Sequence, residues 1–181
     1  MLCRVWDLET TDLKADIGSL IVATFGDMAQ DGSISRLHTE DIRSISGSGS
    51  KDTREKKLAL WARDKVEEAD ILIGHNSLAF DRHFLNGVLF RHGERMCQKR
   101  IHWDTMQVAK GKLSMGVSMA NLADILLNDN KDKPSKHEWR QANLLDEDAL
   151  KRLRQRCEED VRLTADMWNR LKPIFHNWKG T

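Results

Sequence analysis

The chain has 181 residues, with 29 basic and 28 acidic side chains that leave a formal net charge of +1. This length suits one compact domain, and an apolar content of 40% lies near the range of globular proteins. Because 31% of the residues are charged and only 2 are prolines, the composition excludes a disordered or fibrous chain.

The expected location is the cytoplasm, with no membrane partner. No apolar run approaches the roughly 18 residues that span a bilayer, and charged residues fall where a signal peptide would be apolar. The 3 cysteines have no metal-binding spacing and are expected to be free thiols inside the cell. Residues 91–156 carry 14 basic and 9 acidic groups, an excess that could meet a polyanion, although a solvated face explains it more simply.

Hydrophobic periodicity and turn residues predict five strands and four helices. The strands are expected at residues 3–9, 20–25, 33–39, 70–74 and 100–105. The helices are expected at residues 52–69, 81–92, 119–127 and 150–171, with Pro173 ending the last one and residues 128–145 forming a loop. This order predicts an α/β fold over residues 1–181 as a single domain. Its mixed sheet combines an antiparallel three-strand meander with parallel strands, flanked by helices.

Two carboxylates, Asp7 and Glu9, stand two residues apart on the first strand. Side chains alternate along a strand, so these two share a face, together with the apolar Val5. Like charges this close repel unless a cation neutralises them, and Mg²⁺ or Mn²⁺ prefers such oxygen ligands. A solvent-exposed face with two hydrated acids is the simpler alternative.

Two further acids, Asp81 and Asp160, indicate a functional site only in combination with the first pair. Asp81 follows the buried strand 70–74 and opens a helix, where an acid could merely favour the helix dipole. Asp160 lies within the last helix beside apolar positions, although a helical aspartate is usually a surface residue.

Taken together, three segments resemble the motifs of the DEDD (DnaQ-like) 3′–5′ exonucleases, which have a ribonuclease H-like fold. Asp7-Leu-Glu-Thr-Thr11 resembles the first motif, and Gly74-His-Asn-Ser-Leu-Ala-Phe-Asp81 the second. Cys157-Glu-Glu-Asp-Val-Arg-Leu-Thr164 resembles the third. The order and spacing agree from residue 5 to residue 172, and smaller features are most similar to stand-alone phage or bacterial members.

The resemblance implies a metal-dependent 3′–5′ exonuclease with a ribonuclease H-like fold. Its substrate would be a single-stranded DNA or RNA 3′ end, and the sequence identifies no polymerase, replication or repair partner. Two Mg²⁺ or Mn²⁺ ions would be the cofactors of a two-metal mechanism. The catalytic metal ligands would be Asp7, Glu9, Asp81 and Asp160, and the substrate-binding residues Thr10, Asn76 and Arg156.

The third motif departs from the family at one position. Relatives carry Tyr four residues or His five residues before the last Asp, where this chain has Arg156 and Gln155. Arginine cannot act as a base, but it could pair with Asp160 or grip a phosphate oxygen. His137 could take the role of base, or the enzyme could be slow without one. The main alternative is a catalytically weak nucleic-acid-binding module of the same fold, and an endonuclease or resolvase is a third.

Overall fold

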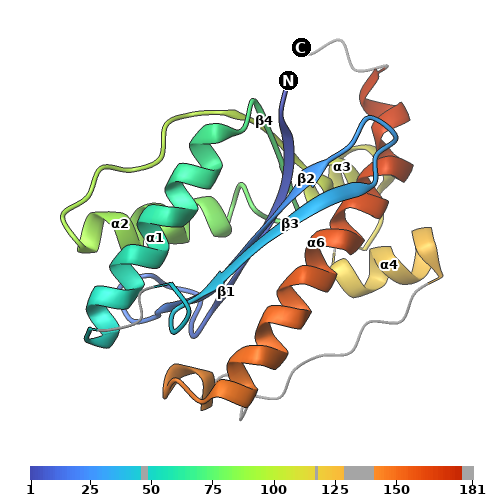
Figure 1. Cartoon of the computed structure of the whole chain (residues 1–181). Coiled ribbons are helices and arrows are strands. Elements are labelled where there is room, and N and C mark those ends of the chain that lie inside the picture. Colours follow the sequence, from blue (N-terminus) through green and yellow to red (C-terminus); the bar gives the residue numbers. More distant parts are fainter. Residues whose placement is uncertain (46–48, 117, 129–140, 177–181) are drawn as a thin grey trace.

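A five-stranded mixed sheet forms the centre of the computed structural model, which describes residues 1–45, 49–116, 118–128 and 141–176. The strands are β1 (Cys3–Thr10), β2 (Leu20–Met28), β3 (Ile34–Asp41), β4 (Ile71–Gly74) and β5 (Ile101–Asp104). Their order across the sheet is β3-β2-β1-β4-β5 (Figure 1). The pairs β1–β2 and β2–β3 are antiparallel, whereas β1–β4 and β4–β5 are parallel. The predicted mixed sheet is therefore confirmed, with β1 at its centre.

Helices cover both faces of this sheet (Figure 1). The helices are α1 (Lys51–Glu68), α2 (Asp81–Arg91), α3 (Thr105–Val108), α4 (Met119–Leu127) and α6 (Glu147–His176), together with one π-helical turn, η1 (Ala109–Leu113). Helices α1 and α2 lie on one side, and the long α6 crosses the other with α4 beside it. In the ranges that the structure describes, no helix has the length and apolar character to cross a bilayer.

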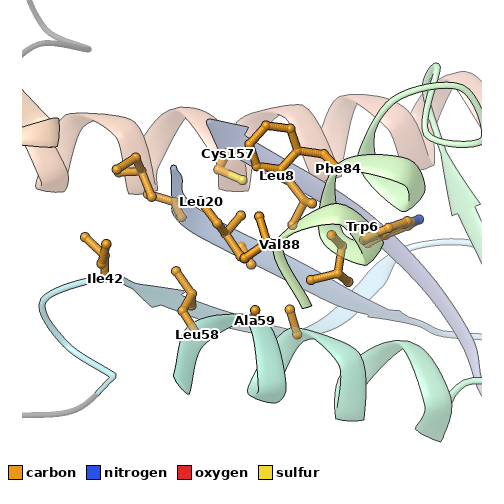
Figure 2. Packing of buried hydrophobic residues seen from close by; sticks show 14 of the residues in the cluster. Trp6, Leu8, Leu20, Ile42, Leu58, Ala59, Phe84, Val88 and Cys157 are labelled. Atoms are coloured by element: carbon orange, nitrogen blue, oxygen red, sulfur yellow. The ribbon is translucent and has the colours of Figure 1, made fainter. Parts of the chain in front are cut away.

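The alternation of β1 divides its side chains between the two helical layers. Trp6 and Leu8 enter the large core that includes residues of α1 and α2, and Figure 2 shows both among the buried apolar side chains. Val5 points to the opposite face, where it packs with Val161 of α6. Because residues of equal parity share a face, Asp7 is directed with Val5 toward α6.

A glycine on β2 allows α6 to approach the sheet closely. Gly26 pairs with Val5 across the β1–β2 ladder. A Cβ atom at Gly26 would lie only 2.8 Å from Cγ1 of Val161, closer than packed carbon atoms come. The missing side chain therefore determines how near the helix that carries Asp160 can come to β1.

Several helix ends differ from the predicted ones, including the start of α6 at Glu147 rather than at residue 150, and two of the differences have a clear cause. The last helix does not end at Pro173 but continues to His176, because this exposed proline lies close to the end of the helix and removes only one N–H donor. Helix α1 begins at Lys51 rather than at Asp52, because the Oγ atom of Ser50 accepts a hydrogen bond of 3.2 Å from the backbone N–H of Thr53.

The sequence also failed to predict the helical segment after β5. Asp104 starts it, since its side chain accepts hydrogen bonds from the backbone N–H groups of Met106 (3.0 Å) and Gln107 (3.3 Å). In addition, residues 141–143 are helical although residues 128–145 were expected to form a loop. An acid that caps a short helix gives too weak a periodic signal to be recognised in a sequence.

Candidate active site

Strand β1 carries the first two acids of the candidate site to the face covered by α6. Asp7 lies opposite Thr24 of β2, and Glu9 lies opposite Val22. Asp7 is half-buried and Glu9 is only 6% exposed. The alternative that both acids are simply hydrated on an open face is therefore wrong for this strand.

Helix α6 brings the third acid to the same place. Asp160 is 5% exposed, and its carboxylate joins those of Asp7 and Glu9 so that one oxygen of each lies within 4.8 Å of the others. Asp160 is about 150 positions from the other two acids in the sequence. Three of the four acids expected to lie together are thus in one cluster, called the acidic cluster below (Asp7, Glu9 and Asp160).

Asp81 lies beside this cluster without being part of it. It is the first residue of α2, is 3% exposed, and accepts a hydrogen bond of 3.0 Å from the backbone N–H of Leu8, the residue between Asp7 and Glu9. Its carboxylate is thus bound to the β1 backbone next to the acidic cluster, and it is not one of the three whose oxygens lie within 4.8 Å of one another. Burial, reinforced by the Asp104 carboxylate, raises the pKa of Asp81 to about 7.

The loop between β4 and α2 is held by the side chain of Asp104. This carboxylate accepts 3.0 Å hydrogen bonds from the backbone N–H groups of both Asn76 and Leu78. Asn76 has a φ of 62°, a left-handed conformation that asparagine tolerates better than most residues. Asn76 therefore has a conformational role in this turn, whether or not its side chain also contacts a substrate.

His75 of the same loop has a defined orientation. Its Nδ1 atom lies 2.9 Å from Oγ1 of Thr105, whose hydroxyl donates to the carbonyl oxygen of Gly74 over 3.2 Å. Because that hydroxyl has one proton, it accepts from His75, so Nδ1 is the protonated ring nitrogen.

At the end of β1, the Thr10 hydroxyl donates to the carbonyl oxygen of Asp12 over 2.8 Å.

Arg156 reaches into the acidic cluster from one helical turn before Asp160. Its Nε atom lies 3.4 Å from Oε1 of Glu9, and its Nη2 atom lies 3.8 Å from Oδ2 of Asp160. The side chain is 21% exposed. The expected pairing of Arg156 with Asp160 is therefore present, and the contact with Glu9 is an addition that the sequence did not suggest.

Cys157 is a member of the site that the sequence indicated only as a core position. Its buried Sγ atom lies 3.4 Å from Oδ2 of Asp7 and the same distance from the carbonyl oxygen of that residue. Burial, together with the nearby Asp7 and Glu9 carboxylates, raises the pKa of the thiol well above its usual value. The protonated thiol therefore donates to Asp7, and all three cysteines are free, as expected.

Asp52, Glu55 and His92 form a second group of potential metal ligands. The hydrogen bonds of Glu55 give this group a role in holding the fold together. The 3% exposed Glu55 accepts hydrogen bonds from the backbone N–H of Leu20 (2.8 Å), from Arg91 (2.6 Å) and from His92 (3.1 Å). Arg91 also donates to carbonyl groups of the loop after β1. This group therefore connects that loop to α1 and α2.

The donor set of the acidic cluster fits a hard divalent cation. Three carboxylates supply oxygen ligands only, which Mg²⁺ and Mn²⁺ prefer. Asp81 is close by, and a nearby cation would favour its ionised form. His137 lies outside the residues that the structure describes, as does most of the expected loop 128–145.

Comparison with known proteins identifies a structural relative but no sequence family. No protein-family model and no curated protein sequence matches the chain. The family B DNA polymerase from the hyperthermophilic archaeon Pyrobaculum calidifontis has a similar structure, with a TM-score of 0.72 and 14% sequence identity. The similarity covers 96% of this chain but only 25% of the polymerase chain. It shows the fold, which is α/β and ribonuclease H-like.

Proposed function

We propose that this protein is a metal-dependent 3′–5′ exonuclease that hydrolyses phosphodiester bonds at single-stranded nucleic-acid ends. The observation that carries the proposal is the convergence of Asp7, Glu9 and Asp160, whose carboxylate oxygens lie within 4.8 Å of one another. The structural similarity to part of a DNA polymerase supports a nucleic-acid substrate. The direction of cleavage rests on the resemblance of the three sequence motifs.

In the proposed site, Asp7, Glu9, Asp81 and Asp160 would hold two Mg²⁺ or Mn²⁺ ions. Such ions supply the positive charge that offsets the phosphate and lower the pKa of water. The chain itself orients the ligands: the Cys157 thiol donates to Asp7, and Asp81 is anchored to the β1 backbone.

Substrate contacts are proposed for Thr10, Asn76 and Arg156. Thr10 ends β1, and Asn76 lies in the loop after β4, the parallel neighbour of β1. Both are therefore at the edge of the sheet where parallel strands end, which is the usual ligand-binding edge of α/β folds. Arg156 would pair with a phosphate oxygen, since a guanidinium offers two parallel donors.

The test is cleavage of 3′- and 5′-labelled DNA and RNA oligonucleotides in Mg²⁺, Mn²⁺ or chelator. We expect metal-dependent release of mononucleotides from the 3′ end, and at least about a 100-fold loss of rate in Asp160→Asn. The matched control is Glu159→Gln, which neutralises the adjacent, exposed acid of the same helix and should retain the rate. Equal rates in the two variants would refute the assignment of Asp160 to the active site.

One observation favours the second candidate, a catalytically weak nucleic-acid-binding module. Arg156 occupies the position of the family's Tyr and cannot accept a proton from water. Oligonucleotide binding without cleavage in either metal would support this candidate. Cleavage of circular single strands would instead indicate an endonuclease or resolvase, because a circle has no 3′ end.

A further inference from the structure

Arg156 contacts two of the carboxylates that the proposed metal ions require. Its guanidinium lies 3.4 Å from Glu9 and 3.8 Å from Asp160, although these acids come from different elements. By contrast, Arg154 of the same helix points elsewhere and lies 3.3 Å from Asp41 of β3. Of these two arginines, Arg156 is the one that contacts the acidic cluster.

The guanidinium has an electrostatic role in this position. Three carboxylates within 4.8 Å repel one another, and the repulsion is strong because Glu9 and Asp160 are each less than 10% exposed. Arginine keeps its positive charge at every physiological pH, so Arg156 offsets part of the repulsion when no metal is bound.

A divalent cation would compete with Arg156 for the same two carboxylates. The cation and the guanidinium repel each other, and both need lone pairs of Glu9 and Asp160. The side chain of Arg156 is 21% exposed and long enough to turn toward solvent. Sharing these carboxylates therefore weakens the binding of both cations.

We infer that Arg156 is the resident counter-ion of the metal-free site, and that divalent-metal binding displaces its guanidinium from Glu9 and Asp160. Arg156 thereby lowers the affinity of the site for metal. The displaced guanidinium becomes available to the phosphate of a substrate, a step that rests on the proposed function. Metal and phosphate would then bind cooperatively, since each favours the displaced position.

Calorimetric titration with Mn²⁺ alone tests the displacement without any measurement of activity. We expect Arg156→Gln to bind Mn²⁺ about tenfold more tightly than the wild type, because no competing cation has to leave. Arg154→Gln is the matched control and should bind Mn²⁺ as the wild type does. An affinity in Arg156→Gln that is unchanged or weaker would overturn the inference.

Thermal unfolding gives a second, independent measurement. In chelator, Arg156→Gln should melt below the wild type because the acidic cluster loses its counter-ion. In saturating Mn²⁺ this difference should disappear or reverse. Equal melting temperatures of the two proteins in chelator would also contradict the role of counter-ion.

The outcomes separate this inference from the proposed function. Tighter Mn²⁺ binding in Arg156→Gln without cleavage by any variant would preserve the inference and refute the exonuclease. Metal-dependent cleavage, with equal Mn²⁺ affinities in the wild type and Arg156→Gln, would support the exonuclease and refute the inference. The absence of Mn²⁺ binding in all three proteins would refute both.

Discussion

Three neighbouring side chains of α6 meet β1 through three different interactions. Asp160 adds a third carboxylate to the pair from β1, Arg156 adds a positive charge, and Cys157 donates a hydrogen bond to Asp7. One helical turn thus brings a carboxylate, a positive charge and a thiol donor to the same place. Their chemistry depends on which β1 residue each one reaches, because the same side chains on an exposed helix would only be hydrated.

At this scale, we predict that the hydrogen bond of Cys157 positions Asp7. Cys157→Ala should lower the rate of metal-dependent cleavage several-fold, as expected for the loss of about 1 kcal/mol of hydrogen bonding. Cys157→Ser retains a donor and should restore most of the rate. Steady-state kinetics of both variants, with urea unfolding as the measure of stability, separate positioning from packing. Equal rates in the two variants would exclude a role for the donor.

The position of α6 against the sheet depends on particular residues of neighbouring elements. Gly26 of β2 leaves room for Val161, one residue after Asp160. On the other face, Glu55 of α1 accepts from Leu20 at the start of β2 and from Arg91 at the end of α2. The approach of Val161 to Gly26 determines how close α6 lies to β1. The hydrogen bonds of Glu55 connect the loop that follows Thr10 to α1 and α2.

At the scale of elements, Gly26→Ala should destabilise the protein by about 1–3 kcal/mol in urea unfolding, since the added methyl group overpacks the interface. Val161→Ala removes the nearest atom that this methyl group would meet, so the loss in the double variant should be smaller than the sum of the losses in the two single variants. Gly111→Ala is the control, because a Cβ there would meet nothing within 4 Å. Losses in the two single variants that simply add in the double variant would contradict this explanation.

The candidate site exists only in the folded molecule. Its acids come from β1, α2 and α6, and the sheet order places β1 between the antiparallel and the parallel strands. His102 of β5 contributes to this arrangement: its Nε2 atom lies 3.3 Å from Nε1 of Trp6 on β1 and 2.8 Å from Oγ of Ser77. This one imidazole thus connects β5 with β1, and both with the loop before Asp81.

For the whole molecule, we predict that His102 contributes to the pH dependence of stability in mild acid. Burial lowers the pKa of His102 from 6.5 to about 4, so below pH 6.5 the unfolded chain binds more protons than the folded one. The contribution of His102 to the free energy of unfolding should therefore fall as the pH drops from 6.5 to about 4. Asp81, whose pKa is raised to about 7, contributes in the opposite sense over this range, because the folded chain holds its proton. Compared with the wild type, His102→Gln should therefore lose less stability, or gain more, as the pH falls, measured by urea unfolding across this range. An unchanged dependence in that variant would disprove the assignment.

Local patterns were sufficient to predict much of this protein. The strands, the main helices and the shared face of Asp7 and Glu9 follow from periods of two and of about 3.6 residues. The end at Pro173, the cap at Ser50 and the helical segment after Asp104 were not predicted correctly. Each depends on one hydrogen bond or on local exposure, which a periodic pattern does not report.

By itself, the sequence determined the order of the elements, the α/β class and the acids that could form a site. Only the tertiary structure decided that Asp160 joins Asp7 and Glu9, that Asp81 binds the backbone beside them, and that Arg156 pairs with Glu9. The physical reason is that periodicity arises between residues close in the chain. Contacts between β1 and α6 depend instead on packing distance and side-chain rotamers, which are determined only when distant segments meet.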